Sequence, residues 1–200
     1  NGAGKTTLMN CVCGIYKPDQ GSILIDGHDT TGRAPHEVAH RGVGRTFQIA
    51  ETFSSLTVIE NVQMALLSHH NLICAPWRRA GAHRRDQALT LLAQVGMHEQ
   101  ADRPCSELAY GDVKRVELAI AMANEPKLLL MDEPTAGMSK SETSRFINLI
   151  KDVTVGKTLL TVEHDMGVVF GLADRIAVVV YGEVLAFDTP DAVRANDRVQ

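Results

Sequence analysis

Short apolar runs alternate with helical patterns in the first and last parts of the chain. The runs that predict strands are 22–27, 43–47, 127–131, 158–162, 176–180 and 183–187. The run at 127–131 is apolar throughout, which is typical of a parallel strand covered on both faces. The last two runs flank Tyr181-Gly182, so they predict a hairpin.

Helical spacing dominates the middle of the chain, from about residue 49 to 122. Thr57 and Glu60 form a capping box ahead of one predicted helix. Further helices are predicted over 5–13, 86–95 and 112–123. Three more are predicted to follow the N-cap residues Ser139, Asp165 and Thr189. Residues 68–85 lack a clear hydrophobic period and are predicted to be irregular. This order predicts one α/β domain with an inserted α-helical subdomain: core residues 1–48 and 123–200, and an insert over 49–122.

Composition narrows the class of protein. The 200 residues are 44% hydrophobic, enough for a large core, and the formal charge of −4 argues against binding nucleic acid by bulk charge. The four cysteines lack the spacing of a zinc site and are expected to be reduced thiols. No apolar run approaches the roughly 18 residues that span a bilayer.

The first seven residues, Asn1 to Thr7, match most of a phosphate-binding loop. Gly4, Lys5 and Thr6 supply its end, while the opening glycine of the pattern would precede residue 1. Successive backbone N–H groups of such a loop surround a phosphate, and the following helix directs its positive end at the same anion. Lys5 is expected to reach the outer phosphates, and the Thr6 hydroxyl is expected to bind Mg²⁺.

Two acids follow the buried strand predicted at 127–131. Asp132 and Glu133 would lie at the carboxyl edge of the sheet, where open α/β folds bind ligands. Asp132 suits Mg²⁺, directly or through water. Glu133 is placed to orient or deprotonate a water that attacks the γ-phosphate. These residues predict an ATPase.

Five motifs together resemble those of ABC-transporter nucleotide-binding domains, in the same order along essentially the whole chain. They are the Walker A residues 2–7, the Q-loop residues 45–48, the signature residues 108–112, the Walker B residues 130–134 and the switch-histidine residues 163–165. Residues 45–48 followed by 56–62, together with Tyr110-Gly111, resemble the branched-chain amino-acid transporter ATPases within that family. The resemblance implies a P-loop NTPase fold with a RecA-like core.

The resemblance also implies roles for further residues. Gln48 would contact Mg²⁺ and sense ATP, and His164 would hydrogen-bond the γ-phosphate. The signature, Ala109, Tyr110, Gly111 and Asp112, would bind the ATP held by a second ATPase subunit. The ATP-contacting residues of the chain itself would be Asn1, Gly2, Ala3, Gly4, Lys5, Thr6, Thr7 and Gln48.

The signature departs from the family's usual Leu-Ser-Gly-Gly-Gln. Ala109 cannot donate a hydroxyl hydrogen bond, and Asp112 replaces a glutamine. A carboxylate that faced a polyphosphate would repel it, so we expect the Asp112 side chain to point away from the nucleotide. An Asp112→Gln variant with much tighter ATP-dependent dimerisation would contradict this.

The implied partners are a second ATPase subunit, identical or homologous, permease subunits in the membrane and, indirectly, a solute-binding protein; no nucleic acid is expected. The subunit would be peripheral on the cytoplasmic face of the plasma or inner membrane.

The alternatives are an ABC ATPase without a transport role, a transporter for urea or short amides, and a module that binds nucleotide without hydrolysing it. Because the loop begins late, we expect the 200 residues to be a fragment that binds ATP weakly by itself.

Overall fold

The computed structural model describes residues 3–46, 52–69 and 77–199. Contacts divide the chain into two compact units, residues 36–161 and residues 1–35 together with 162–200. The predicted subdomain boundaries at 48 and 122 stay a prediction. Among the described residues, no helix combines the length and apolar character needed to cross a bilayer.

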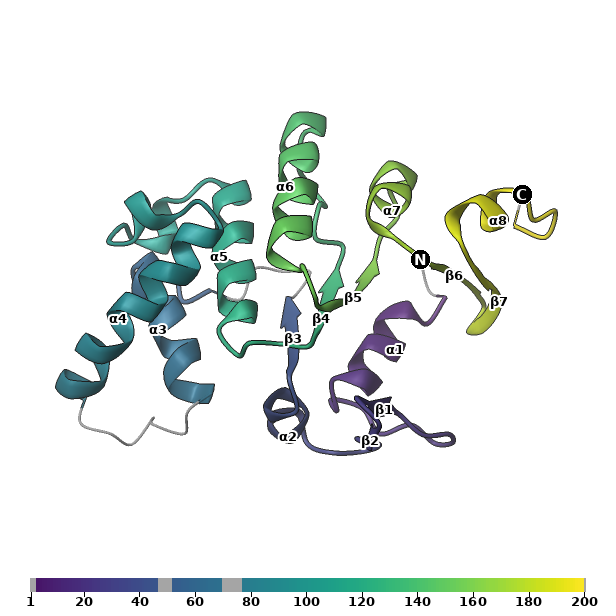
Figure 1. The fold of residues 1–200 in the computed structure, drawn as a ribbon, viewed down its shortest axis with the longest axis horizontal. Coiled ribbons are helices and arrows are strands. Elements are labelled where there is room, and N and C mark those ends of the chain that lie inside the picture. The colour runs from purple at the N-terminus through teal and green to yellow at the C-terminus, as the bar shows by residue number, and fades with distance from the viewer. Residues whose placement is uncertain (1–2, 47–51, 70–76, 200) are drawn as a thin grey trace. The chain divides into compact units, whose positions relative to one another are not determined.

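A three-stranded sheet with a helical layer forms the unit of residues 36–161. The sheet has the order β3 (Val43–Thr46), β4 (Leu128–Asp132), β5 (Thr158–Val162), with β4 in the middle (Figure 1). β3 runs parallel to β4, and Val43 pairs with Leu128. The side chains of Leu129, Leu130 and Met131 are at most 1% exposed. β4 is therefore the buried central strand that its apolar sequence predicts.

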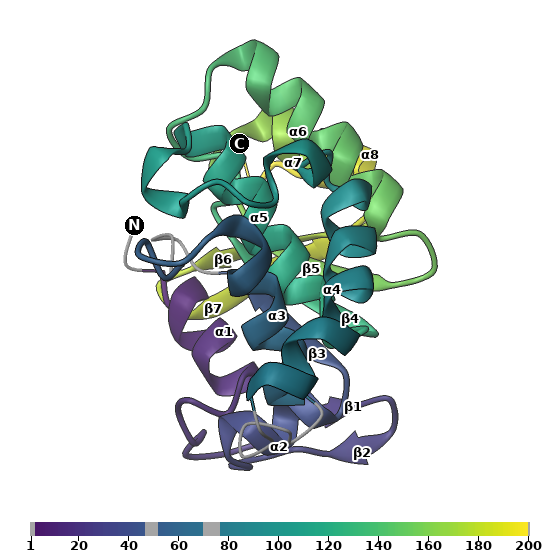
Figure 2. The same ribbon diagram turned by 90° about the vertical axis from the view of Figure 1, so that its left-hand side faces the viewer.

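The helices of this unit lie before β3, between β3 and β4, and between β4 and β5. They are α2 (Pro35–His40), which begins at the unit boundary, α3 (Val58–His69), α4 (Trp77–Gln94), the 3₁₀ turns His98–Gln100 and Cys105–Glu107, α5 (Tyr110–Met122) and α6 (Lys140–Val153). The helices α3, α4 and α5 pack side by side (Figures 1 and 2). α5 also packs closely on β3, since a Cβ on Gly44 would lie 2.7 Å from the carbonyl oxygen of Ala121.

A buried amide fixes the chain that enters α3. Asn61 is 2% exposed, and its side-chain oxygen accepts a hydrogen bond from the Phe53 N–H at 2.8 Å. Its Nδ2 donates to the carbonyls of Phe53 (3.1 Å) and Thr57 (2.9 Å). The predicted capping box is present, since Thr57 N–H donates to Glu60 Oε2 at 2.8 Å and Glu60 N–H donates to Thr57 Oγ1 at 3.3 Å.

The helix α4 corrects one expectation. It begins at Trp77, so the second half of the stretch 68–85, predicted to be irregular, is helical. Alanine and arginine in residues 77–85 favour a helix. They lack the apolar stripe on which the prediction depended. α5 likewise begins two residues before the predicted start, at Tyr110.

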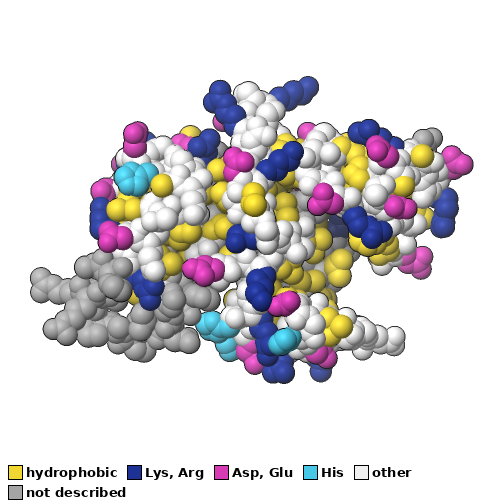
Figure 3. Space-filling model, viewed as in Figure 1, with side chains coloured by type: hydrophobic (Ala, Val, Ile, Leu, Met, Phe, Trp, Pro, Cys, Tyr) yellow, Lys and Arg dark blue, Asp and Glu magenta, His cyan; other side chains and the backbone are white. Residues whose placement is uncertain are grey.

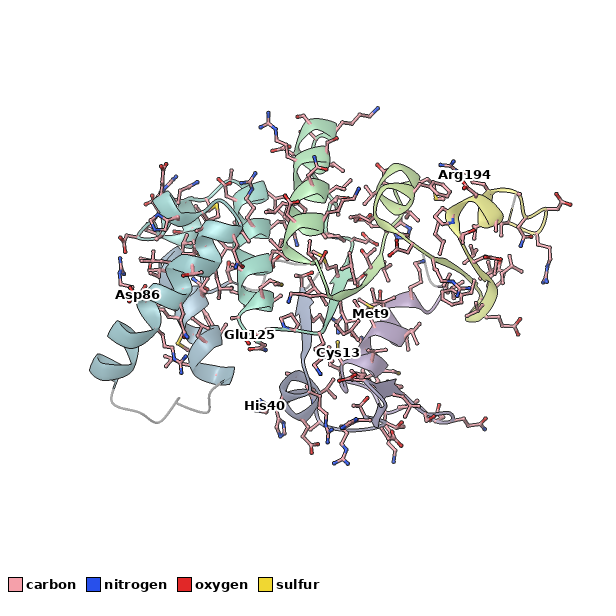
Figure 4. The ribbon with its side chains drawn as sticks, viewed as in Figure 1. Met9, Cys13, His40, Asp86, Glu125 and Arg194 are labelled. Atoms are coloured by element: carbon pink, nitrogen blue, oxygen red, sulfur yellow. The ribbon has the colours of Figure 1, made fainter. Side chains whose placement is uncertain are left out.

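The other unit combines two small antiparallel sheets with short helices. It contains α1 (Lys5–Val12), β1 (Leu24–Ile25), β2 (His28–Asp29), α7 (Met166–Leu172), β6 (Ile176–Val180), β7 (Glu183–Asp188) and α8 (Pro190–Arg194). Met9 of α1 and Cys13, the residue that follows this helix, are labelled in Figure 4 and are buried. The predicted hairpin is confirmed, with Val180 paired to Glu183.

Side-chain contacts hold the C-terminal helix of this unit. The Arg194 guanidinium of α8 stacks on the Phe170 ring of α7, with its carbon 3.9 Å from the ring centroid (Figure 4). Arg175 stacks in the same way on Phe187 of β7 at 4.2 Å. Thr189 caps α8 and Pro190 occupies its first position, as predicted. Basic and acidic side chains are interspersed within each part of the face drawn in Figure 3.

Candidate active site

The phosphate loop leads directly into α1. Gly4 is the N-cap and has φ of 87°, a left-handed conformation that favours glycine. Among the residues that the structure describes, no side chain caps this end, which leaves the first N–H groups of α1 for an anion. Lys5 is half-buried, and Thr6 and Thr7 are exposed. Asn1 and Gly2 lie outside the described residues.

The hairpin turn contacts this loop. The Gly182 N–H donates to the Ala3 carbonyl at 3.1 Å, and a Cβ on Gly4 would lie 3.8 Å from Gly182 Cα. Tyr181 and Gly182 both have positive φ, at 49° and 85°. The sequence predicted the turn but carried no signal for its contact with the loop, because the two segments are far apart in the chain.

Asp132 and Glu133 lie at the carboxyl end of β4, as predicted. Asp132 is the last residue of the strand and is 3% exposed. Glu133 is half-buried and has φ of 48°, so the backbone leaves the strand through a left-handed residue. This conformation costs an L-residue about 1–2 kcal/mol.

Two successive turns follow Glu133. The Ala136 N–H donates to the Glu133 carbonyl at 3.1 Å, and the Met138 N–H donates to the Thr135 carbonyl at 3.2 Å. Ser139 then caps α6 through a capping box with Glu142. Hydrogen bonds to Ser139 lower the pKa of the Glu142 carboxyl. The segment 133–139 is thus a hydrogen-bonded connection between the strand and α6.

The signature residues form the start of α5. Ala109 is the N-cap and supplies no side-chain cap, and its carbonyl accepts the N–H groups of Asp112 (3.0 Å) and Val113 (3.1 Å). Tyr110 is exposed, while Gly111 and Asp112 are half-buried. The direction of Asp112 relative to a nucleotide stays a prediction.

His164 and Gln48 complete the predicted set. His164 is exposed in the connection between β5 and α7, next to Asp165, whose carboxylate caps α7 by accepting the Gly167 N–H at 2.7 Å. Gln48 lies outside the described residues, and β3 ends two residues before it, at Thr46. The structure therefore brings Ala3 to Thr7 together with the hairpin turn, and Asp132 and Glu133 together at the end of β4.

Comparisons with known proteins show the family of the chain. Residues 1–136 match the ABC transporter family. The high-affinity branched-chain amino acid transport ATP-binding protein LivG of Escherichia coli K12 is 41% identical over 211 residues, covering 100% of this chain and 82% of LivG. A nucleotide-free ATP-binding cassette from an ABC transporter has a TM-score of 0.87 at 27% identity and covers 100% of this chain and 83% of that chain.

A further solved structure shows a dimer with nucleotide products. It is the dimeric post-hydrolysis state of the ATP-binding cassette MJ0796 bound to ADP and Pi, with a TM-score of 0.77 at 28% identity, covering 94% of this chain and 81% of that chain. The chain belongs to the ABC transporter family. It is an ATP-binding subunit of that family and an ATPase.

Proposed function

We propose that the chain powers an importer for branched-chain amino acids. The whole-chain similarity to LivG carries the choice of solute. The protein would act as a peripheral subunit on the cytoplasmic face of the membrane. It would pair with a second ATPase subunit, identical or homologous, and dock on permease subunits that receive solute from a binding protein.

The roles proposed for the site follow from the chemistry of its residues. Backbone N–H groups at the start of α1 and the Lys5 ammonium would bind the phosphates of ATP. Thr6, Gln48 and Asp132 offer a hydroxyl, an amide and a carboxylate, an all-oxygen set that suits Mg²⁺, which would neutralise phosphate charge. Glu133 would orient or deprotonate the attacking water, and His164 would hydrogen-bond the γ-phosphate. The signature, Ala109 to Asp112, would close over the partner's nucleotide.

The position of Glu133, directly after Asp132 at the carboxyl end of the buried strand β4, supports its assignment as the general base and suggests the test. In the full-length protein, Glu133→Gln is expected to bind ATP but to lose at least about 100-fold in hydrolysis rate. Glu125→Gln is the matched control, because Glu125 has nearly the same left-handed φ, 46°, and is exposed in a turn before β4 (Figure 4). Unchanged hydrolysis in Glu133→Gln would remove Glu133 as the base.

Measurements of solute uptake distinguish branched-chain amino acids from the other possible solutes. In vesicles that contain the complete transporter, ATP-driven uptake of leucine is expected in the wild type and should be lost in Glu133→Gln. Uptake of urea without uptake of leucine would contradict the proposed solute. Hydrolysis by a full-length protein that neither associates with permease subunits nor supports uptake would favour an ABC ATPase without a transport role.

A further inference from the structure

The ring of Tyr110 lies so close to Gly137 that a side chain on this glycine would touch it. A Cβ on Gly137 would be 3.4 Å from Tyr110 Cε1 and 3.8 Å from Cζ, which is van der Waals contact. Tyr110 is the first residue of α5, and Gly137 lies in the connection between β4 and α6. The contact therefore joins the start of the signature helix to the segment that follows Glu133 within the same subunit.

Gly137 is closely coupled to Glu133 through the backbone. The two turns that follow Glu133 are closed by hydrogen bonds from Ala136 to Glu133 and from Met138 to Thr135, and Gly137 lies within the second. Glu133 and Gly137 both have left-handed backbone, with φ of 48° and 79°. Because both turns are closed by hydrogen bonds, a displacement of Gly137 is expected to move Glu133 as well.

A second residue of α5, Lys114, contacts the Tyr110 ring. Lys114 Nζ lies 5.6 Å from the centroid of the Tyr110 ring, within the range of a cation–π contact. The Lys114 side chain is only 3% exposed and forms an ion pair with Glu117 at 3.0 Å. Although Tyr110 itself is 46% exposed, its ring thus lies between a buried cation and a backbone surface.

We propose that Tyr110 is a positioning residue for ATP hydrolysis, acting in its own subunit. The ring holds the segment 133–138 against α5 and so fixes the carboxylate of Glu133 for the attack of water. For Tyr110 alone, this role replaces the contact with a partner's nucleotide that the signature resemblance implies; Ala109, Gly111 and Asp112 keep that assignment. The role of Tyr110 rests on the proposed function of Glu133.

Removing the ring should lower the rate of hydrolysis without lowering ATP affinity. In the full-length protein, Tyr110→Leu is expected to reduce kcat about tenfold, because small displacements of a catalytic group have large effects on rate. KM and the Kd for ATP should stay within about twofold. Tyr110→Phe keeps the ring and should recover most of the lost kcat. Thermal unfolding of each variant verifies that it is folded.

A matched pair of glycine substitutions tests the contact from the opposite side. Gly137 and Gly156 have similar φ, 79° and 74°, and asparagine tolerates this conformation. A Cβ on Gly156 meets nothing within 4 Å, whereas one on Gly137 touches the ring. The Cβ itself fits beside the ring, but the amide group beyond it has to share the space that the ring occupies. Gly137→Asn is therefore expected to displace the ring and to lower kcat several-fold, and Gly156→Asn should leave it unchanged.

Three results would overturn the proposal. They are an unchanged kcat in Tyr110→Leu, an equal effect of the two asparagine variants, and a loss of ATP affinity that parallels the loss of rate in Tyr110→Leu. The last result would indicate contact with nucleotide instead. These results differ from the result expected if Glu133 is not the base. In that case Glu133→Gln hydrolyses ATP at the normal rate, whatever the Tyr110 variants do.

Discussion

Removal of either charge of the Lys114–Glu117 pair should destabilise the protein far more than removal of either charge of the Arg85–Asp102 pair. Each pair has a closest N–O distance of 3.0 Å. The side chains of the first pair are 3% and 6% exposed, and those of the second are 45% and 76% exposed. The two pairs therefore have the same closest distance but differ strongly in how far their charges are removed from water.

The expected magnitudes follow from burial. Lys114→Met leaves the buried Glu117 carboxylate without the Lys114 ammonium, which costs about 3–5 kcal/mol. Arg85→Met in the exposed pair should cost about 1 kcal/mol or less. The double variant Lys114→Met/Glu117→Leu removes both buried charges and should recover most of the loss, because no unpaired charge remains.

Urea unfolding of the full-length protein, followed by circular dichroism, measures these differences. With a slope of about 2 kcal/mol per molar urea, Lys114→Met should lower the midpoint by roughly 2 M and Arg85→Met by less than about 0.5 M. Equal shifts for the two single variants would refute the reasoning, as would a double variant less stable than Lys114→Met. Either result would mean that the buried pair is effectively solvated.

Three other changes have defined expectations. Tyr181→Asn should raise the free energy of unfolding by roughly 0.5 kcal/mol, since asparagine tolerates left-handed backbone in a two-residue hairpin turn; a lower Tm would contradict this. Asn61→Leu should cost about 1–3 kcal/mol in urea unfolding, because the Phe53 N–H loses the oxygen that accepts its hydrogen bond, and a loss below 0.5 kcal/mol would refute it. Hydrogen bonds from the Ser139 hydroxyl and N–H lower the pKa of Glu142, so its stabilising effect is complete above about pH 4.5 and declines as pH falls through the lowered folded value; Ser139→Ala should reduce this part of the acid dependence of Tm, because it removes the hydroxyl and keeps the N–H.

Local signals in the sequence predicted much of the fold. The strand β5, the start and end of β6 and the cap residues Ser139, Asp165 and Thr189 are where the patterns predict them. Each of these signals acts within a few residues, through apolar periodicity or a side chain that accepts a nearby N–H. The first half of α4 carries no such periodicity, so its helix could not be predicted from apolar pattern.

Other parts of the site depend on contacts that no short pattern encodes. The sequence placed Glu133 after a buried strand, but its left-handed backbone depends on the turns that follow. The contact of Tyr110 with Gly137 joins residues almost thirty positions apart, and that of Gly182 with Ala3 joins residues from opposite ends of the chain. Such pairings arise from tertiary packing, which spacing along a single sequence does not reveal.

The pairing of β3 with β4 has a consequence for the order of folding. The paired residues Val43 and Leu128 are about 85 positions apart, and closing a flexible loop of that length costs about 4 kcal/mol before any strand contact compensates it. The helices α3, α4 and α5 lie within this loop and pack on one another through much more local contacts. We expect these helices to associate first, which shortens the effective loop and makes strand pairing the later, slower step.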